Sequence, residues 1–479
     1  MSGLTLFQAH GTLECPEPNY GKAYRMIRPT DRATLTFLRH LIVTLSVSIV
    51  FAAMFATPAS GQDREAAVPP AQASQAAQAP AATTPLQDLV KRDQLFGDWG
   101  GARGTMATEG TKLDVSFTQF FQWVPNRDTP LLQDPNGAVT TKYMYGGKFD
   151  IIDASDLSKL AWKGLSMNAH VEIRFGDVPL LAGGTLIPTN TALLFPEAED
   201  TKARLSALNF TQVMNPHVAV SVGRFNMVDL YQRAYTGGMG EDKFMNLSFV
   251  IPPVSLRTVP PVAEGVIFAV LKGSDVVAKA GLIESTDAGF FKNGATVLWE
   301  VALPVKLFQK PGHYSVGGEF SSTQATALDQ NPWILLPPFN QPTLTKQGAW
   351  TLNITFDQAV AEDPNDAKKT FGVFGTLAVS DGNPSLIQPF FILGVGGHSL
   401  LRGRDNDTFG IAYSFNGVSA DFKTALDPIR LRNESAGELY YNFAVTHWSL
   451  VTADLQFVDP FAVGSRTRTF FSVRWKLIF

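Results

Sequence analysis

Hydrophobic and polar residues alternate along many stretches of this chain. In residues 165–175 the apolar positions alternate without exception with Ser166, Asn168, His170, Glu172 and Arg174. Residues 471–479 show the same alternation, with aromatic and aliphatic residues at every second position. Because successive side chains of a β-strand point to opposite sides, both stretches predict strands with one apolar and one polar face. Shorter stretches of this kind begin near residues 113, 143, 350, 409 and 451.

Alternating strands suit two architectures. In a soluble β-sandwich the apolar faces pack against a second sheet, and in a membrane barrel they face lipid. The polar row in residues 166–174 would carry a large desolvation cost in a dry core, so it faces either bulk solvent or a water-filled lumen. The alternation alone leaves both architectures open.

The N-terminal part has a different pattern. A mostly apolar run at residues 41–56 follows Arg28, Arg32 and Arg39, and it is shorter than the ~20 residues of a spanning helix. We predict an N-terminal extension plus secretory signal peptide over residues 1–59, with cleavage after Ala59 or Gly61. The alternative is an uncleaved anchor helix. Residues 60–94 are rich in Ala, Pro and Gln and predict a disordered periplasmic linker.

Residues 95–103 carry the motif Leu-Phe-Gly-Asp-Trp-Gly-Gly-Ala-Arg. It resembles the opening segment of the carbohydrate-selective porin family, in which a short helix and the first strand follow. Here the helix would span residues 104–109, Gly110 would end it, and the strand would begin at Leu113. Further blocks of the chain resemble the same family, at residues 146–150, 174–176, 222–225, 243–246, 438–441 and 454–457.

This resemblance implies an all-β fold over residues 95–479. The fold would be a transmembrane antiparallel β-barrel of about sixteen strands in the outer membrane of a Gram-negative bacterium, with a short N-terminal periplasmic segment. The motif would then be a seal at the periplasmic end rather than a binding site.

The strand at residues 471–479 ends in Phe479. It resembles the recognition signal of bacterial outer-membrane barrels, which implies contact with the barrel-assembly machinery. Such a strand closes the barrel against the first strand and so leaves no unpaired edge in the lipid. Monomer and homo-oligomer both remain open.

Composition excludes some classes of partner. The formal net charge is −4, which argues against a nucleic-acid partner because that would need a basic face. The single cysteine, Cys15, lies upstream of the expected cleavage site, so we expect no disulfide in the mature protein.

Two long connections, 176–202 and 227–264, are rich in turn-forming residues. The resemblance implies that they fold into the lumen, and we expect at least one of them to narrow the pore. The alternative is that both are ordinary surface loops. The resemblance implies passive, selective diffusion of mono- or small oligosaccharides, without catalytic residue, metal or cofactor. Polar groups would exchange hydrogen bonds with sugar hydroxyls, and aromatic faces would contact the sugar ring. The candidates on inward strand faces are His170, Glu172, Arg174, Arg224, Asp454 and Gln456, and those in the second connection are Tyr231, Arg233 and Tyr235. Each could instead be a solvated wall residue paired with an opposite charge.

Two alternatives stay open. One is a general or anion-tolerant porin on the same barrel, and the other is an outer-membrane barrel enzyme such as a lipid hydrolase. The chain after the signal peptide has no His-x-x-x-His, His-Glu-x-x-His or Gly-x-Ser-x-Gly spacing, so no catalytic or metal-binding residue is assigned and we do not expect an enzyme.

Overall fold

The structure is a computed structural model that describes part of the chain. The described residues are 85–125, 143–159, 162–179, 182–195, 202–273, 275–286, 291–331, 344–363, 366–427 and 430–479. The expected signal peptide, its cleavage site and most of the expected linker lie outside them. Among the described residues, no helix has the length and apolar character needed to cross a membrane.

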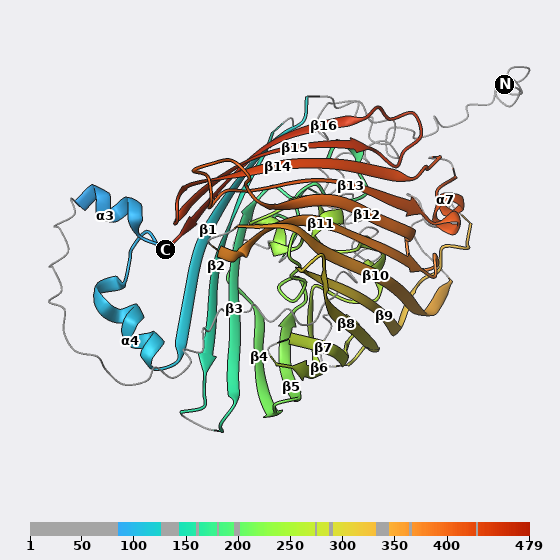
Figure 1. Ribbon diagram of the computed structural model, residues 1–479. Helices are drawn as coiled ribbons and strands as arrows, with labels where there is room; N and C mark the ends of the chain where they lie inside the picture. The colour runs from blue at the N-terminus through green and yellow to red at the C-terminus, as the bar shows by residue number, and fades with distance from the viewer. Residues whose placement is uncertain are drawn as a thin grey trace, which may run out of the picture.

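Sixteen antiparallel strands form a closed barrel in which each strand pairs with its sequence neighbour and β16 pairs with β1 (Figure 1). This confirms the predicted fold class. The strands are β1 (Thr111–Trp123), β2 (Tyr143–Asp156), β3 (Leu165–Gly176), β4 (Arg204–Asn215), β5 (Val218–Asn226), β6 (Val262–Lys272), β7 (Asp275–Glu284), β8 (Ala295–Leu307), β9 (Lys310–Thr326), β10 (Thr345–Asp363), β11 (Asp366–Ser380), β12 (Ile387–His398), β13 (Thr408–Val418), β14 (Glu434–Thr446), β15 (Ser449–Asp459) and β16 (Arg468–Ile478).

The closing strand has the two faces that its sequence predicts. Its register sets Ile478 opposite Ser116 and Phe471 opposite Trp123. Phe471 and Val473 are 44% and 49% exposed on the outside, whereas Arg474 is fully buried on the inside. Alternation therefore separates a lipid-facing row from an inward row in this strand.

One outward polar residue has a local explanation. Gln119 interrupts the apolar outer row of β1, and its side-chain oxygen accepts a hydrogen bond of 2.9 Å from the hydroxyl of Tyr145 on β2. The pairing supplies a hydrogen-bond partner that lipid would not offer.

The two ends of the barrel differ in their connections. Short turns join β4 to β5, β8 to β9 and β14 to β15 at one end, and the longer connections lie at the other. Outer-membrane barrels place short turns on the periplasmic side, which assigns this end to the periplasm. The N-terminal helices α3 (Pro85–Lys91), η1 (Trp99–Gly101) and α4 (Ala102–Thr108) lie at this end.

The helix expected at residues 104–109 is present as α4, which begins two residues earlier. Gly110 follows it with a φ of 92°, as expected for a helix stop that needs the left-handed region. The helix α3 lies within the stretch predicted as a disordered linker, so the last part of that stretch is helical.

Both long connections fold into the barrel. The first, here called the first inner segment (residues 182–195), contains η3 (Ala182–Gly184). The second, the inner loop (residues 227–261), contains η4 (Gly238–Gly240), α5 (Leu247–Val250) and η5 (Pro253–Arg257). A further helix, α7 (Ala420–Ala425), follows β13.

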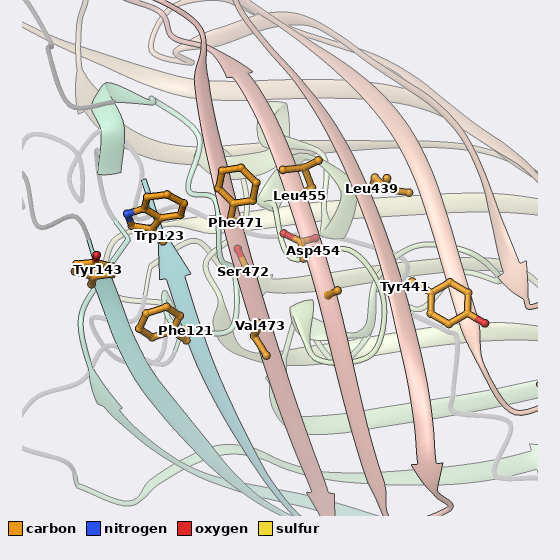
Figure 2. A pocket seen from close by; sticks show the side chains of 11 residues that line it. Phe121, Trp123, Tyr143, Leu439, Tyr441, Asp454, Leu455, Phe471, Ser472 and Val473 are labelled. Atoms are coloured by element: carbon orange, nitrogen blue, oxygen red, sulfur yellow. The ribbon is translucent and has the colours of Figure 1, made fainter. Parts of the chain in front are cut away.

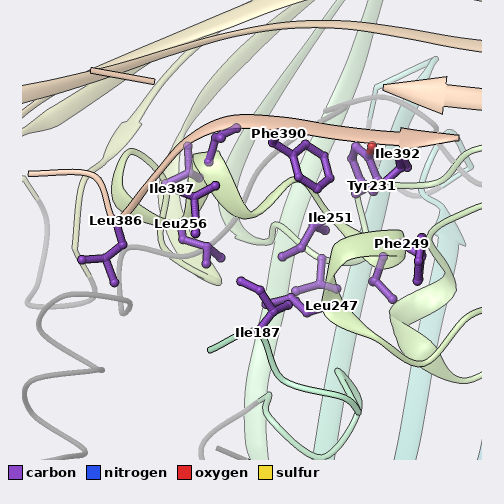
Figure 3. Packing of buried hydrophobic residues seen from close by; sticks show 14 of the residues in the cluster. Ile187, Tyr231, Leu247, Phe249, Ile251, Leu256, Leu386, Ile387, Phe390 and Ile392 are labelled. Carbon is purple, nitrogen blue, oxygen red and sulfur yellow. The ribbon is translucent and has the colours of Figure 1, made fainter. Parts of the chain in front are cut away.

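The inner loop forms a hydrophobic core with one side of the barrel wall (Figure 3). Phe244 is fully buried, with its ring centroid 5.6 Å from that of Phe374 on β11 and 4.9 Å from that of Tyr440 on β14. Phe390 and Ile392 on β12 belong to the same core. The inner face of β11–β14 therefore carries an apolar patch beneath the inner loop, next to the buried Glu434 and Glu438 of β14, whereas the inner face of β3 is polar.

Small inward residues on this wall make room for the loop. A Cβ atom added to Gly410 on β13 would lie 2.5 Å from the rings of Phe244 and Tyr440, and one added to Gly372 on β11 would lie 2.5 Å from the hydroxyl oxygen of Tyr235. Separations this short are not tolerated in packed interiors, so the approach of the loop requires a glycine at Gly410. At Gly372 an added Cβ would also lie 2.3 Å from the main-chain oxygen of Gln358 on the neighbouring strand.

Candidate functional site

Two glutamates on β14 hold the two inner segments. The Glu438 carboxylate accepts hydrogen bonds from the backbone N–H groups of Met245 and Asn246, at 2.5 and 2.9 Å. The Glu434 carboxylate accepts the N–H groups of Leu186 and Ile187, at 2.7 and 2.8 Å. Four residues apart on a strand, the two side chains share one face. Each side-chain carboxyl group thus accepts hydrogen bonds from two consecutive backbone donors.

Gln456 on β15 connects both inner segments to the wall. Its amide nitrogen donates to the carbonyl oxygen of Thr189 at 2.9 Å and to Asp454 Oδ1 at 3.1 Å. Its amide oxygen accepts from Asn246 at 3.2 Å. Gln456 and Asp454 therefore take part in positioning the two segments.

A buried ionic network holds the opposite side of the inner loop. Lys148 Nζ on β2 lies 3.1 Å from Asp150, 2.7 Å from Glu172 on β3 and 2.9 Å from Glu241 of the loop. His170 bridges Asp150, at 3.0 Å, and Asp229 of the loop, at 2.6 Å. Buried ion pairs thus connect strands β2 and β3 to the loop. Removing one partner of such a pair is strongly destabilising.

The loop carboxylate in this network stays ionised over a wide pH range. Burial alone would raise the pKa of Glu241, but the positive charges of Lys148 and Lys476 outweigh burial and lower it to about 2. Lys476 Nζ lies 3.3 Å from Glu241 and 2.8 Å from Asp242. Glu241 is therefore an anionic anchor between two strands.

The network also contains a group with metal-ligand geometry. One ligand atom each of Asp150, His170 and Glu172 lies within 4.8 Å of the others. However, the Lys148 ammonium group already contacts two of these carboxylates and would repel a cation. We assign no metal to it.

A second charged cluster lies where the inner loop meets β7 and β8. Arg233 of the loop donates to Glu300 on β8 at 2.7 Å, and Lys279 on β7 lies 2.5 Å from the other oxygen of Glu300. The Arg233 guanidinium lies 5.6 Å from the ring centroid of Tyr231, close enough for a cation–π contact. Burial would lower the pKa of Arg233, but Glu300 outweighs it, so the pKa is raised. Arg233, Tyr231, Glu300 and Lys279 are called the Arg233 cluster below.

The cluster keeps unused hydrogen-bonding capacity. Arg233 Nε, and Oδ1 of the neighbouring Asp357 on β10, have no hydrogen-bond partner among the described residues, and the Arg233 side chain is 11% exposed. Both atoms are themselves buried, so the part of Arg233 that a passing solute would meet is the exposed remainder of its side chain.

The predicted site residues fall into separate groups. His170 and Glu172 lie in the Lys148 network, Asp454 and Gln456 lie beside Glu438, and Tyr231 and Arg233 lie in the Arg233 cluster. Those that are at most 5% exposed are His170, Glu172, Arg174, Tyr231, Tyr235, Asp454 and Gln456. The structure therefore does not bring the nine candidates into one site. Tyr231, Arg233 and Tyr235 belong to the inner loop, and His170 and Gln456 contact the inner segments from the wall.

Arg174 and Tyr235 each donate a hydrogen bond to a neighbouring part of the protein. Arg174 donates to the carbonyl oxygen of Asp177 at 3.4 Å, and the Tyr235 hydroxyl donates to Thr370 on β11 at 3.0 Å. Tyr235 thereby connects the inner loop to the wall on which it packs.

The predicted inward orientation of Arg224 is wrong. The β5 register pairs it with Leu208 and Glu264, in the same row as Val222, which is 54% exposed, while Phe225 points inward with 2% exposure. Arg224 therefore lies on the outer face near the extracellular end of β5, where the membrane interface tolerates a charge.

Sequence reasoning missed several residues of these clusters. On β8, Glu300 alternates with the outward residues Val297, Trp299 and Val301. This alternation is enough to predict that Glu300 points inward. For Glu241 and Glu434 no local signal exists, because their partners are far away in the sequence.

A groove of about 830 Å³ lies on the outer surface of the barrel (Figure 2). It crosses β14, β15, β16, β1 and β2, with Ala453 among larger residues such as Phe121, Trp123 and Tyr441. These side chains belong to the outward rows, so the groove is part of the lipid-facing surface and not of the pore.

Comparisons with known proteins agree with this architecture. A family model described as carbohydrate-selective porin, OprB family, matches residues 140–463. Porin B of Pseudomonas aeruginosa is 22% identical over 415 residues, which cover 76% of this chain and 86% of that protein.

Solved structures show the same fold. The high-pH structure of Pseudomonas putida OprB superposes with a TM-score of 0.68 at 17% identity, covering 81% of this chain and 99% of that one. The low-pH structure of the same protein gives a TM-score of 0.51. Porins are channels rather than enzymes, and this family of β-barrels is found in the Gram-negative outer membrane. Since the family model matches well over half of the chain, the protein belongs to the OprB family of carbohydrate-selective porins.

Proposed function

We propose that this porin lets mono- and small oligosaccharides diffuse passively across the outer membrane and that they pass the Arg233 cluster. The observation that carries the proposal is the ion pair of Arg233 with Glu300 at 2.7 Å. It joins the inner loop to the barrel wall while leaving the arginine partly exposed. A solute that passes between the loop and β8 would meet this pair.

The chemistry of the cluster suits a neutral, hydroxylated solute. Guanidinium and carboxylate groups exchange hydrogen bonds with hydroxyls, and the Tyr231 ring offers an apolar face. Glu300 pairs with both Arg233 and Lys279, and the Asp357 carboxyl group also interacts electrostatically with Arg233. Two acidic groups thus oppose the two positive charges of the cluster, which favours neutral solutes over free anions. Weak, exchangeable contacts of this kind allow both entry and release.

The other predicted contacts have a different role in this proposal. His170 and Gln456 contact the inner segments directly, whereas Glu172 and Asp454 contact Lys148 and Gln456, which in turn bind these segments. We therefore assign all four to positioning the loop. Tyr231 and Arg233 remain the proposed sugar contacts, with Tyr235 supporting the loop beside them.

Single-channel conductance in a planar bilayer tests the proposal. Glucose, maltose and a small organic anion are titrated in turn against the wild type, Arg233→Ala and Arg224→Ala. Arg224 is the matched control, because it is an arginine on the outer face. Saturable block by a sugar is expected in the wild type and the control. In Arg233→Ala the sugar affinity should fall about tenfold, since hydrogen bonds to charged groups contribute about 1.5–3 kcal/mol.

The outcomes separate the alternatives. Conductance that no sugar blocks, combined with block by the anion, would instead support a general or anion-tolerant porin. Equal sugar block in Arg233→Ala and the wild type would remove the cluster from the proposed pathway.

We also propose that residues 1–59 direct export and that β16 contacts the barrel-assembly machinery. N-terminal sequencing of the protein isolated from outer membranes should begin at Ser60 or Gln62. Retention of residues 41–56 in the mature protein would favour the anchor helix.

A further inference from the structure

The N-terminal segment, residues 88–104, lies against the seam at which β16 meets β1. Leu95 N–H donates to the carbonyl oxygen of Ile478 at 2.8 Å. The ring of Phe96 stacks on Phe479, with 5.3 Å between centroids and 25° between planes. Arg103 donates a hydrogen bond to the main-chain oxygen of Phe479. Three motif residues thus contact the end of the closing strand.

The seam has an incomplete edge at this end. Strand β1 starts at Thr111, but its pairing with β16 begins at Ser116, and only the Phe479 N–H reaches further, to the carbonyl oxygen of Val115 at 2.9 Å. Unpaired strand edges are liabilities in sheets. Residues 92–107 face this edge across a hollow of about 460 Å³ that Thr111 also lines.

The turn of the motif aims Arg103 at β16. Trp99, Gly100 and Gly101 have φ angles of 51°, 67° and 94°, and a tryptophan in the left-handed region is strained. The Asp98 carboxylate accepts the N–H of Gly104 at 2.8 Å, and the Arg103 guanidinium lies 4.3 Å from the Trp99 ring centroid. Each polar or aromatic residue of the turn therefore helps to fix the arginine.

The helix α3 attaches to the neighbouring strands. Trp448 Nε1, in the turn between β14 and β15, donates to the carbonyl oxygen of Leu89 at 2.9 Å. In the same turn, His447 lies 2.9 Å from Asp93. The segment therefore contacts β16, the edge of β1 and the β14–β15 turn together.

We propose that residues 88–104 are a clasp that binds the end of β16 and keeps the barrel seam closed. The contact partners are β16 and the adjoining part of β1, which lie side by side only once the seam has formed. The clasp therefore acts after closure and slows reopening. This role is separate from sugar passage, because none of its contacts involves the inner loop or the Arg233 cluster.

The first test is the rate at which the folded barrel loses its characteristic mobility in SDS gels at a fixed elevated temperature. Phe96→Ala and Arg103→Ala are compared with Arg92→Ala, whose guanidinium pairs with Asp88 within the segment. Each clasp variant should unfold about tenfold faster than the wild type, since an aromatic stack or a charged hydrogen bond is lost. The control should unfold at the wild-type rate, and the conductance and sugar block of all three should be unchanged.

A cysteine pair gives a second, independent test. The chain has one native cysteine, Cys15, and the hydrogen bond of 2.8 Å from the Leu95 N–H to the Ile478 carbonyl oxygen places these two residues side by side. Leu95→Cys with Ile478→Cys should cross-link in the folded barrel and restore slow unfolding to Arg103→Ala under oxidising conditions only.

Several outcomes would overturn the clasp. The first is that Arg103→Ala and Phe96→Ala unfold no faster than Arg92→Ala. The second is that the cysteine pair fails to cross-link in the folded protein. If Arg103→Ala yields no folded barrel, recovery by the oxidised cysteine pair supports the clasp, and no recovery refutes it. Loss of sugar block in the wild type would refute the proposed transport function and leave the clasp untouched.

Discussion

At the scale of single residues, the absence of a side chain at Gly410 is what lets Phe244 reach the barrel wall. Gly410→Ala should displace the inner loop and lower the free energy of unfolding by about 1–3 kcal/mol, as overpacking does. Denaturant unfolding of the refolded barrel measures this.

The matched control for this glycine is Gly437→Ala on the next strand, where an added Cβ meets only the Ala412 carbonyl oxygen at 3.9 Å. If Gly410→Ala and Gly437→Ala lower the free energy of unfolding equally, the loss comes from a change in strand propensity and not from displacement of the loop.

Glu438 makes a prediction about channel noise. Glu438→Gln keeps the size of the side chain but offers one carbonyl oxygen where the carboxylate accepts two backbone N–H groups. The N–H group left without an acceptor should loosen the inner loop, and single-channel recordings should show larger fluctuations of the open current. Glu362→Gln, at a partly exposed pair with Lys310, serves as the control. Quiet traces in Glu438→Gln would show that the loop does not depend on this carboxylate.

At the scale of elements, alternation was sufficient to predict several of the strands, whereas their number was implied by the family resemblance. Residues 165–175 and 471–479 form β3 and β16 with the predicted faces, because the two-residue period of a strand is a local property. That the inner loop folds into the barrel was implied by the family resemblance, with its length as further support. Its contacts were not, because the partners of Glu438 and Lys148 are distant in the sequence. The predicted inward orientation of Arg224 is wrong because it rests on the polarity of the side chain.

The pKa of Glu241 makes the attachment of the inner loop depend on pH. Its pKa is lowered to about 2 in the folded protein, against about 4.3 in an unfolded chain. The stabilisation is therefore fully present above about pH 4.3 and is lost as the pH falls towards 2. Sugar block should stay constant from pH 7 to 5 and weaken progressively below pH 4.

Glu241→Gln provides the comparison for this titration. This variant lacks the titrating carboxyl group. Its sugar block should therefore already be weak at pH 7 and should change less below pH 4 than that of the wild type. A wild-type transition between pH 7 and 5 would point to another group as the pH-sensitive anchor.

At the scale of the whole molecule, the outer rows form a belt that must remain apolar. Val473 lies near the middle of β16 and is 49% exposed on the lipid side. Val473→Arg should cost about 2–4 kcal/mol of folding free energy, and Leu307→Arg, at the periplasmic end of β8, about 0–1 kcal/mol. Reversible unfolding in lipid vesicles measures both. Equal costs would mean that Val473 does not lie at the depth of the hydrocarbon core.

The packing of the inner loop on β11–β14 has a consequence for nanopore engineering. Excising the loop would not yield a wider version of the same channel, because it would uncover Phe374, Phe390 and Ile392 to the lumen. A wall of this kind expels water and interrupts conduction even where the passage is physically open. A wide sensor pore built from this scaffold would first need hydrophilic residues grafted onto that half of its interior.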